Sequence, residues 1–102
     1  MIFTVLEPLI MKQSMSKSIH NELYRNLINE LAQERIRLNI SQGELAAQIN
    51  LTQPSISKIE KLERRLDVLE FSMILNALRI KENVRLQHII KDFIGLSHDE
   101  NC

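Results

Sequence analysis

The segment SQGELAAQINLTQPSISKIEK, residues 41–61, decides the fold of this chain. Ser41 followed three residues later by Glu44 is a capping box, in which each side chain bonds the other residue's backbone amide at a helix start. Thr52 can cap a second helix, because Pro54 then falls in the first turn, where a missing N–H has no cost. The segment therefore predicts two short helices, at about Gln42–Ile49 and Gln53–Lys61.

The apolar residues of this segment predict that the two helices pack against each other at a steep angle. Asn50 tolerates the left-handed backbone conformation that a tight turn needs, and Ala46 is small enough for the helices to cross closely. Two helices joined in this way, at roughly 90–120°, form a helix-turn-helix, although many helical hairpins use similar core residues. The residues expected to face inward are Leu45, Ala46, Ile49, Leu51, Ile56 and Ile59.

The polar residues of the second helix carry the functional signal. Its outward face contains amide, hydroxyl and ammonium groups and no acidic residue before Glu60. Such groups donate hydrogen bonds to the acceptors on base edges and phosphates. A solvated face without a function is the alternative, but this bias toward donors favours DNA recognition. The residues on this face are Gln53, Ser55, Ser57, Lys58 and Lys61.

Three further helices are predicted around this pair, which gives an all-α, compact five-helix domain. A helix of about 18 residues precedes the pair, and Asn39 ends it. Asp67 and Glu70 form a second capping box at the start of the fourth helix, and Gly95 closes a fifth helix over about Glu82–Ile94. The apolar faces expected for these three helices are Leu23, Tyr24, Leu27, Ile28, Leu31, Ile36 and Leu38; Val68, Phe71, Ile74, Leu75 and Leu78; and Leu86, Ile89, Ile90, Phe93 and Ile94.

The two ends of the chain are expected to lie outside the domain. The apolar run 1–10 is too short to span a membrane and lacks the basic start of a signal peptide, so we expect a cytoplasmic protein with no membrane partner. Translation from Met1, Met11 or Met15 stays open. The expected divisions are an N-terminal extension or arm at 1–17, the DNA-binding domain at 18–95 and a flexible tail at 96–102.

The composition argues against several other classes of protein. The chain has 102 residues, enough for one domain, and its formal net charge is zero, so positive charge for DNA must be concentrated locally. One cysteine, Cys102, cannot form an internal disulfide or a paired-cysteine metal site. The three histidines are dispersed, and we recognise no catalytic triad, paired carboxylates or glycine-rich phosphate loop. We therefore expect no metal, no cofactor and no enzymatic activity.

The runs RIRLNISQGELA (35–46) and SISKIE (55–60) resemble the phage-repressor, Cro and Xre family of helix-turn-helix proteins. The resemblance covers about Tyr24–Ile80 and implies a lambda-repressor-like fold that binds double-stranded DNA with the second motif helix in the major groove. It also implies an ion pair between Arg35 and Glu60 inside the fold.

The resemblance further implies individual roles at the DNA. Gln42 matches a phosphate contact, Gln53 and Lys58 match base-reading positions, and the basic residues after the helix match phosphate contacts. Pro54 replaces a residue that often reads bases. Leu62 stands where many members have glycine, so the loop at this position can differ in shape from theirs. The complete expected DNA-binding set is Gln42, Thr52, Gln53, Ser55, Ser57, Lys58, Lys61, Arg64 and Arg65.

Three functions fit this sequence. The first is a repressor-like transcription regulator that binds an operator as a homodimer, through the fifth helix or the apolar N-terminal arm. The second is a protein-interaction module that has lost DNA binding, against which the cluster Lys58, Lys61, Arg64 and Arg65 argues. The third is an antitoxin that binds a toxin and represses its own operon.

Overall fold

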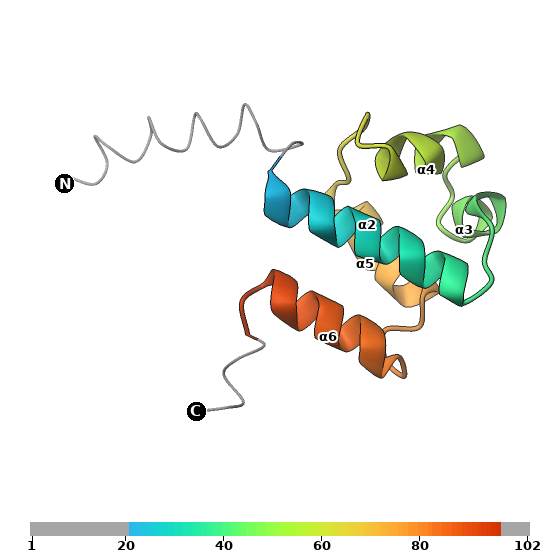
Figure 1. Ribbon diagram of the computed structural model, residues 1–102. Coiled ribbons are helices and arrows are strands. Elements are labelled where there is room, and N and C mark those ends of the chain that lie inside the picture. The colour runs from blue at the N-terminus through green and yellow to red at the C-terminus, as the bar shows by residue number, and fades with distance from the viewer. Residues whose placement is uncertain (1–20, 97–102) are drawn as a thin grey trace.

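The computed structural model describes residues 21–96, and within this range the chain forms five α-helices and no β-strand. Figure 1 shows the arrangement, and the predicted all-α, five-helix fold is confirmed. The expected arm, its boundary at residue 18 and nearly all of the expected tail lie outside the described residues. The helices are α2 (Glu22–Arg37), α3 (Gln42–Gln48), α4 (Gln53–Glu60), α5 (Val68–Ala77) and α6 (Val84–Phe93).

Each helix begins after a side chain that accepts a hydrogen bond from a backbone amide three residues later. Both predicted capping boxes, at 41–44 and 67–70, are present, and Thr52 caps α4 as expected. The last helix begins at Val84 instead of near residue 82, because Asn83 is its N-cap. Since a capping side chain contributes about 1 kcal/mol of helix stability, these starts are fixed by local sequence.

Among the described residues, four that are not glycine have a left-handed backbone. Asn39 (φ 62°) and Asn50 (φ 63°) take this conformation where the sequence predicts turns. Leu62 (φ 65°) and Arg79 (φ 66°) also adopt it, at a cost of roughly 1–2 kcal/mol for a residue with a Cβ atom. Leu62 therefore has the backbone conformation that a glycine takes easily, and neighbouring contacts must hold it there.

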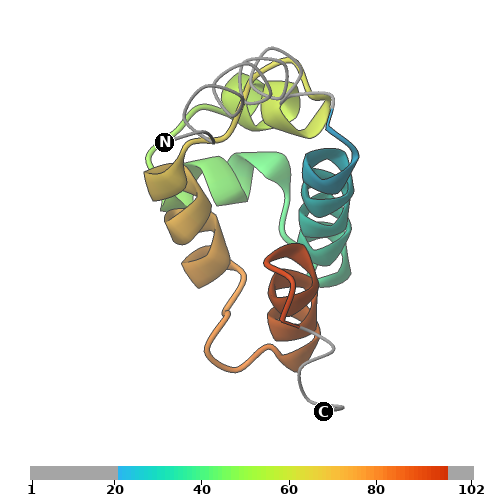
Figure 2. The same ribbon diagram turned by 90° about the vertical axis from the view of Figure 1, so that its left-hand side faces the viewer.

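The helices surround one hydrophobic core, with α4 and α6 at opposite ends of the domain (Figures 1 and 2). Helix α2 packs against both α4 and α6, and α3 packs against α4 and α5. Five of the six residues expected to face inward from the motif are buried, and Leu51 is half-buried against them. The buried apolar residues are Leu27, Ile28, Leu31, Leu45, Ala46, Ile49, Ile56, Ile59, Ile74, Leu78 and Leu86.

Four apolar positions expected on buried faces are instead exposed. Ile36 is 62% exposed because it lies nine residues after buried Leu27, about two and a half helical turns, and so on the opposite face. Val68, 84% exposed, is the first residue of α5, and Leu23 and Ile94 lie in the first turn of α2 and just after α6. Helix ends project beyond the core, so regular spacing overestimates their burial.

A buried carboxylate, Glu34, joins α2 to the loop between α5 and α6. Its side chain is almost completely buried, accepts hydrogen bonds from Arg37 and lies 3.3 Å from Nε of Arg85. Asn83 Nδ2 donates to Glu34 at 2.7 Å and to the carbonyl of Leu78 at 3.0 Å. The hydrogen bonds from Arg37 hold the pKa of Glu34 below its ordinary value, although burial opposes this. The sequence pattern did not predict this cluster.

Replacing Glu34 with Gln should lower the free energy of unfolding by about 1–3 kcal/mol, because a buried hydrogen-bond acceptor is lost and its donors lose a partner. The matched control is Glu30→Gln, on the same helix but exposed, which should change stability by less than about 0.5 kcal/mol. Denaturant unfolding followed by circular dichroism measures both. Equal losses would show that the Glu34 cluster contributes nothing specific.

The stability difference between wild type and Glu34→Gln should also depend on pH. The pKa of Glu34 is lower in the folded protein than its ordinary value, so the charged network stabilises the fold fully above the unfolded pKa of about 4.3. That stabilisation is lost as pH falls through the folded pKa. Unfolding measured from about pH 7 to about pH 3 should show the two proteins converging in acid, and a constant difference would contradict this.

Candidate nucleic-acid interface

Helix α4 presents a fixed outward face because its inward face is locked into the core. Ile56 and Ile59 are both buried, which turns Gln53 and Lys58 to the solvent. Pro54 lies in the first turn of the helix, as predicted. The structure thus brings the two expected base-reading residues, Gln53 and Lys58, onto one exposed helix.

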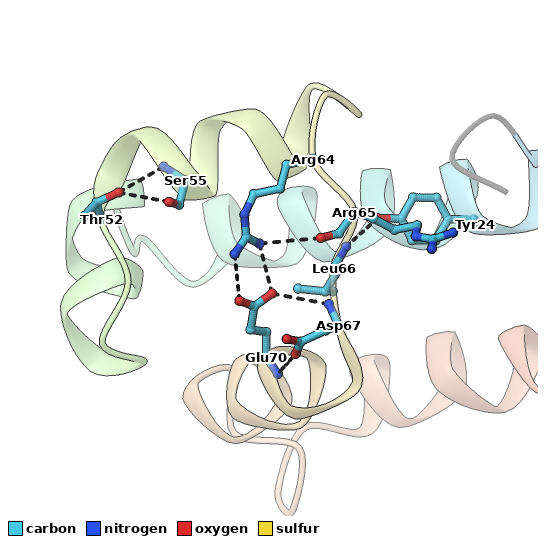
Figure 3. Close-up of polar contacts among 8 residues, drawn as sticks. All are labelled: Tyr24, Thr52, Ser55, Arg64, Arg65, Leu66, Asp67 and Glu70. Atoms are coloured by element: carbon cyan, nitrogen blue, oxygen red, sulfur yellow. Dashed lines mark hydrogen bonds and ion pairs between the residues drawn. The ribbon is translucent and has the colours of Figure 1, made fainter. Parts of the chain in front are cut away.

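The start of α4 is closed by contacts between two residues of the expected set. Thr52 Oγ1 accepts from the backbone amide of Ser55 at 3.3 Å and shares a 3.0 Å hydrogen bond with its hydroxyl (Figure 3). Ser55 and Ser57 are only partly exposed, whereas Thr52 is exposed. The hydrogen bonds between Thr52 and Ser55 therefore stabilise the start of α4. A DNA contact by either residue stays a prediction.

The predicted ion pair between Arg35 and Glu60 is confirmed. Nε and Nη2 of Arg35 donate to the two carboxylate oxygens of Glu60 at 2.8 and 3.0 Å, and Nη1 donates to the carbonyl of Ile40 at 2.8 Å. The two side chains are only 10% and 16% exposed. The pair therefore ties α2 and the loop after it to the last turn of α4.

Gln42, expected at a phosphate, bridges the two helices of the motif. Its Nε2 donates to Glu60 at 2.9 Å, and its Oε1 accepts from Nε2 of Gln53 at 2.7 Å. A carboxamide nitrogen carries two hydrogens, so one donor of Gln42 remains for a phosphate. The Glu60–Gln42 and Gln42–Gln53 contacts were not predicted, although the three residues were each singled out.

The loop after α4 is held by a second ion pair, which was not predicted from the sequence. Nη1 and Nη2 of Arg64 donate to the carboxylate of Glu70 at 2.9 and 2.8 Å (Figure 3). Glu70 also accepts from the amide of Asp67, and the hydrogen bonds from Arg64 lower its pKa. Together with the bond from the amide of Leu66 to the Tyr24 hydroxyl at 3.1 Å, these contacts fix the loop against α5 and α2.

Positive charge is concentrated on this side of the neutral chain. Residues 52–66 contain four basic and two acidic residues, and Glu60 is already paired with Arg35. Neither Lys58 nor Lys61 forms an ion pair within residues 21–96, and both are exposed. Arg64 is partly exposed beside Glu70, and Arg65 is exposed. The surface around α4 therefore offers charged and amide donors to a polyanion.

A metal site and a membrane span find no support in the part of the chain that the structure describes. Within it, no His, Cys, Asp and Glu side chains group together in a way that could hold a metal ion. None of its helices has the length and apolar character that crossing a bilayer requires.

Comparison with known proteins agrees with this geometry. Residues 31–84, slightly more than half of the chain, match a family model described as Helix-turn-helix. The matched range runs from the middle of α2 to the first residue of α6 and contains all of α3, α4 and α5. A comparison with curated proteins found no match.

Replacing Glu60 with Gln should lower the melting temperature more than replacing Glu63, an exposed acid just beyond the same helix. Removing one charge of a partly buried pair leaves the other poorly compensated and costs up to a few kcal/mol. Thermal unfolding of both variants measures the difference. Equal melting temperatures would refute a structural role for the pair.

Proposed function

Because the chain belongs to the Cro/C1-type, Xre-like helix-turn-helix family, we propose that it is a repressor-like regulator that binds an operator as a homodimer. Family membership makes it a DNA-binding transcription regulator; the operator, the repression and the dimer are our proposals. We place it in the cytoplasm, where its DNA would be. Selection of bound duplexes from a random pool tests the proposal, and enrichment of no common sequence would refute it.

The observation that carries the proposal is the exposed face of α4, whose side chains can donate hydrogen bonds. Gln53 and Lys58 are exposed on a helix whose other face is buried and whose end is tied to α2. A glutamine can bond adenine at N6 and N7, and a lysine can donate to O6 and N7 of guanine. We therefore assign base reading to these two residues, with α4 lying in the major groove.

Phosphate contacts are assigned to the groups around α4. Gln42 lies at the start of α3, where helix geometry favours an anion, and Lys61, Arg64 and Arg65 follow the recognition helix. Glu70 offsets the charge of Arg64, so we expect Arg64 to act mainly by holding the loop in shape. These contacts would set how strongly the protein binds, whatever the base sequence.

A homodimer is proposed because one recognition helix reads only a few base pairs, and half-sites lie about one helical turn apart on one face of the duplex. The fifth helix, α6, lies at the opposite end of the domain from α4 (Figure 2), and its apolar residues Leu86, Ile89, Ile90 and Phe93 pack against the core of their own domain, so we favour another surface for the interface. Val68 and Leu69 are 84% and 68% exposed at the start of α5, beside the loop after α4. We therefore place the interface there.

An antitoxin would use the same DNA-binding surface to repress its own operon. A small toxin gene beside this one, and co-purification of the two products, would favour that function.

Lys58→Ala should cost about 1–3 kcal/mol on the selected operator and relax selectivity at one base position. Arg65→Ala should weaken binding to all sequences alike and reduce the slope of affinity against salt by about one unit. Titrations of each variant against the operator and a scrambled duplex, at several salt concentrations, measure both effects. The reverse pattern would mean that the recognition helix is misplaced.

Val68→Asp should reduce dimer formation, because it puts charge into the proposed apolar interface. Val84→Asp is the matched control: Val84 is also exposed and is also the first residue of its helix, α6. Light scattering at micromolar concentration, with and without operator, measures the oligomeric state. A clean wild-type monomer in both conditions would contradict the dimer, and disruption by Val84→Asp alone would move the interface to α6.

A further inference from the structure

A cleft of about 410 Å³ lies between the end of α2, the turn after α5 and the start of α6. Three of its lining residues are arginines, Arg37, Arg79 and Arg85, and Glu82 is the one acidic residue beside them. Each arginine comes from a different element: the last residue of α2, the turn after α5 and the second residue of α6. We call this site the arginine cleft. Its volume falls in the range of about 300–1,000 Å³ that is usual for small-molecule sites.

The buried carboxylate of Glu34 orients two of the three arginines. It accepts hydrogen bonds from Nε and Nη2 of Arg37, and its Oε1 lies 3.3 Å from Nε of Arg85. A guanidinium carries five N–H donors, and these contacts leave Nη1 of Arg37 and both terminal nitrogens of Arg85 without a partner within residues 21–96. Both side chains are exposed, at 47% and 67%. Glu34 thus holds two guanidiniums in place while their remaining donors stay accessible to an anion.

The third arginine, Arg79, has a backbone conformation that is unfavourable for its residue type. Its φ is 66°, in the left-handed region that glycine adopts at much lower cost. Its side chain is exposed and forms no hydrogen bond or ion pair within the part of the chain that the structure describes. No internal contact of the guanidinium therefore offsets the cost of the backbone. Strain of this kind, retained without a structural return, is a reason to look for a function.

Arg85 also occupies a position that disfavours its charge. It lies in the first turn of α6, where the positive end of the helix dipole opposes a cation, and that turn contains no acidic residue. Arg37, in the last turn of α2, is by contrast at a favourable position. Two of the three arginines are therefore placed against local preference, and both line the same cleft. An anion bound there would compensate both.

We propose that the arginine cleft binds a small-molecule polyanion, a compact molecule with two or more phosphate or carboxylate groups. The planar fork of a guanidinium matches the oxygens of either group, and arginines from three separate elements can engage more than one such group at once. The cleft includes the start of α6, at the opposite end of the domain from α4 (Figure 2). The ligand and DNA would thus occupy different surfaces, and the proposal does not depend on DNA binding.

Inorganic pyrophosphate and citrate are the probes for a first test, by isothermal titration calorimetry at low ionic strength. Wild type should bind at least one of them saturably, with a Kd below about 1 mM. Binding of pyrophosphate alone would assign the cleft to a phosphorylated ligand, and binding of citrate alone to a carboxylate ligand. The absence of saturable binding to both probes would overturn the proposal.

The place of binding is tested by the shifts of backbone amide signals in nuclear magnetic resonance spectra during the same titrations. The largest shifts should be those of Arg79, Val84 and Arg85, which line the cleft. Largest shifts around α4 would mean that the probes occupy the DNA-binding surface, which would overturn the proposal. Shifts at the cleft caused by a scrambled DNA duplex and by neither probe would assign the cleft to nucleic acid and would also overturn it.

Arg79→Gly separates ligand binding from stability. It removes a cation of the cleft and installs the residue that the left-handed backbone favours, so the melting temperature should stay the same or rise while probe binding weakens by at least about tenfold. The matched control is Lys81→Ala, which removes an exposed cation two residues further along that does not line the cleft; it should weaken binding by less than about threefold. Equal weakening by the two variants would indicate general charge attraction, and unchanged binding by Arg79→Gly would exclude its role. Either result would overturn the proposal.

Discussion

The ion pair between Arg35 and Glu60 connects the hydrophobic core of this domain to its candidate DNA-binding surface. The three hydrogen bonds that Arg35 donates connect α2 to the carbonyl of Ile40 in the following loop and to Glu60 in the last turn of α4. A pair this buried contributes little net stability, because removing two charges from water offsets much of their attraction. Its main effect is geometric, since a planar guanidinium with two bonds to one carboxylate restricts the relative positions of the two helices.

Glu34, the residue before Arg35 on α2, makes a similar connection to the opposite end of the domain. Glu34 and Arg35 are consecutive and therefore point about 100° apart around the helix. Arg35 reaches α4, and Glu34 reaches Asn83 at the start of α6. One turn of α2 thus sets the positions of both ends of the fold. The loop after α4 has its own restraint in Arg64 and Glu70, which helps to explain how Leu62 keeps an unfavourable backbone conformation.

What the sequence predicts best are features decided by a few neighbouring residues. Both capping boxes, the turns at Asn39 and Asn50 and the position of Pro54 are local, and each is found as expected. The Arg35–Glu60 pair spans 25 residues and was accessible only through resemblance to a family. Burial of Glu34 and pairing of Arg64 with Glu70 were missed, because each depends on which side chain an adjacent element brings near. The exposure of Val68 was missed because the spacing of apolar residues does not show where a helix extends beyond the core.

The electrostatics of the chain limit how this interface can work. Non-specific DNA affinity comes largely from cations that displace counterions from phosphates, and a chain with zero net charge has no general surplus of them. Two basic residues in contact with α4 or the loop after it are moreover paired with carboxylates, Arg35 with Glu60 and Arg64 with Glu70. Each pair weakens the attraction of its arginine to the phosphate backbone, but it also fixes the local geometry. If the chain binds an operator as a homodimer, as we propose, such an interface would depend on correctly placed base contacts and on a second half-site, and its selectivity would be high relative to its overall affinity.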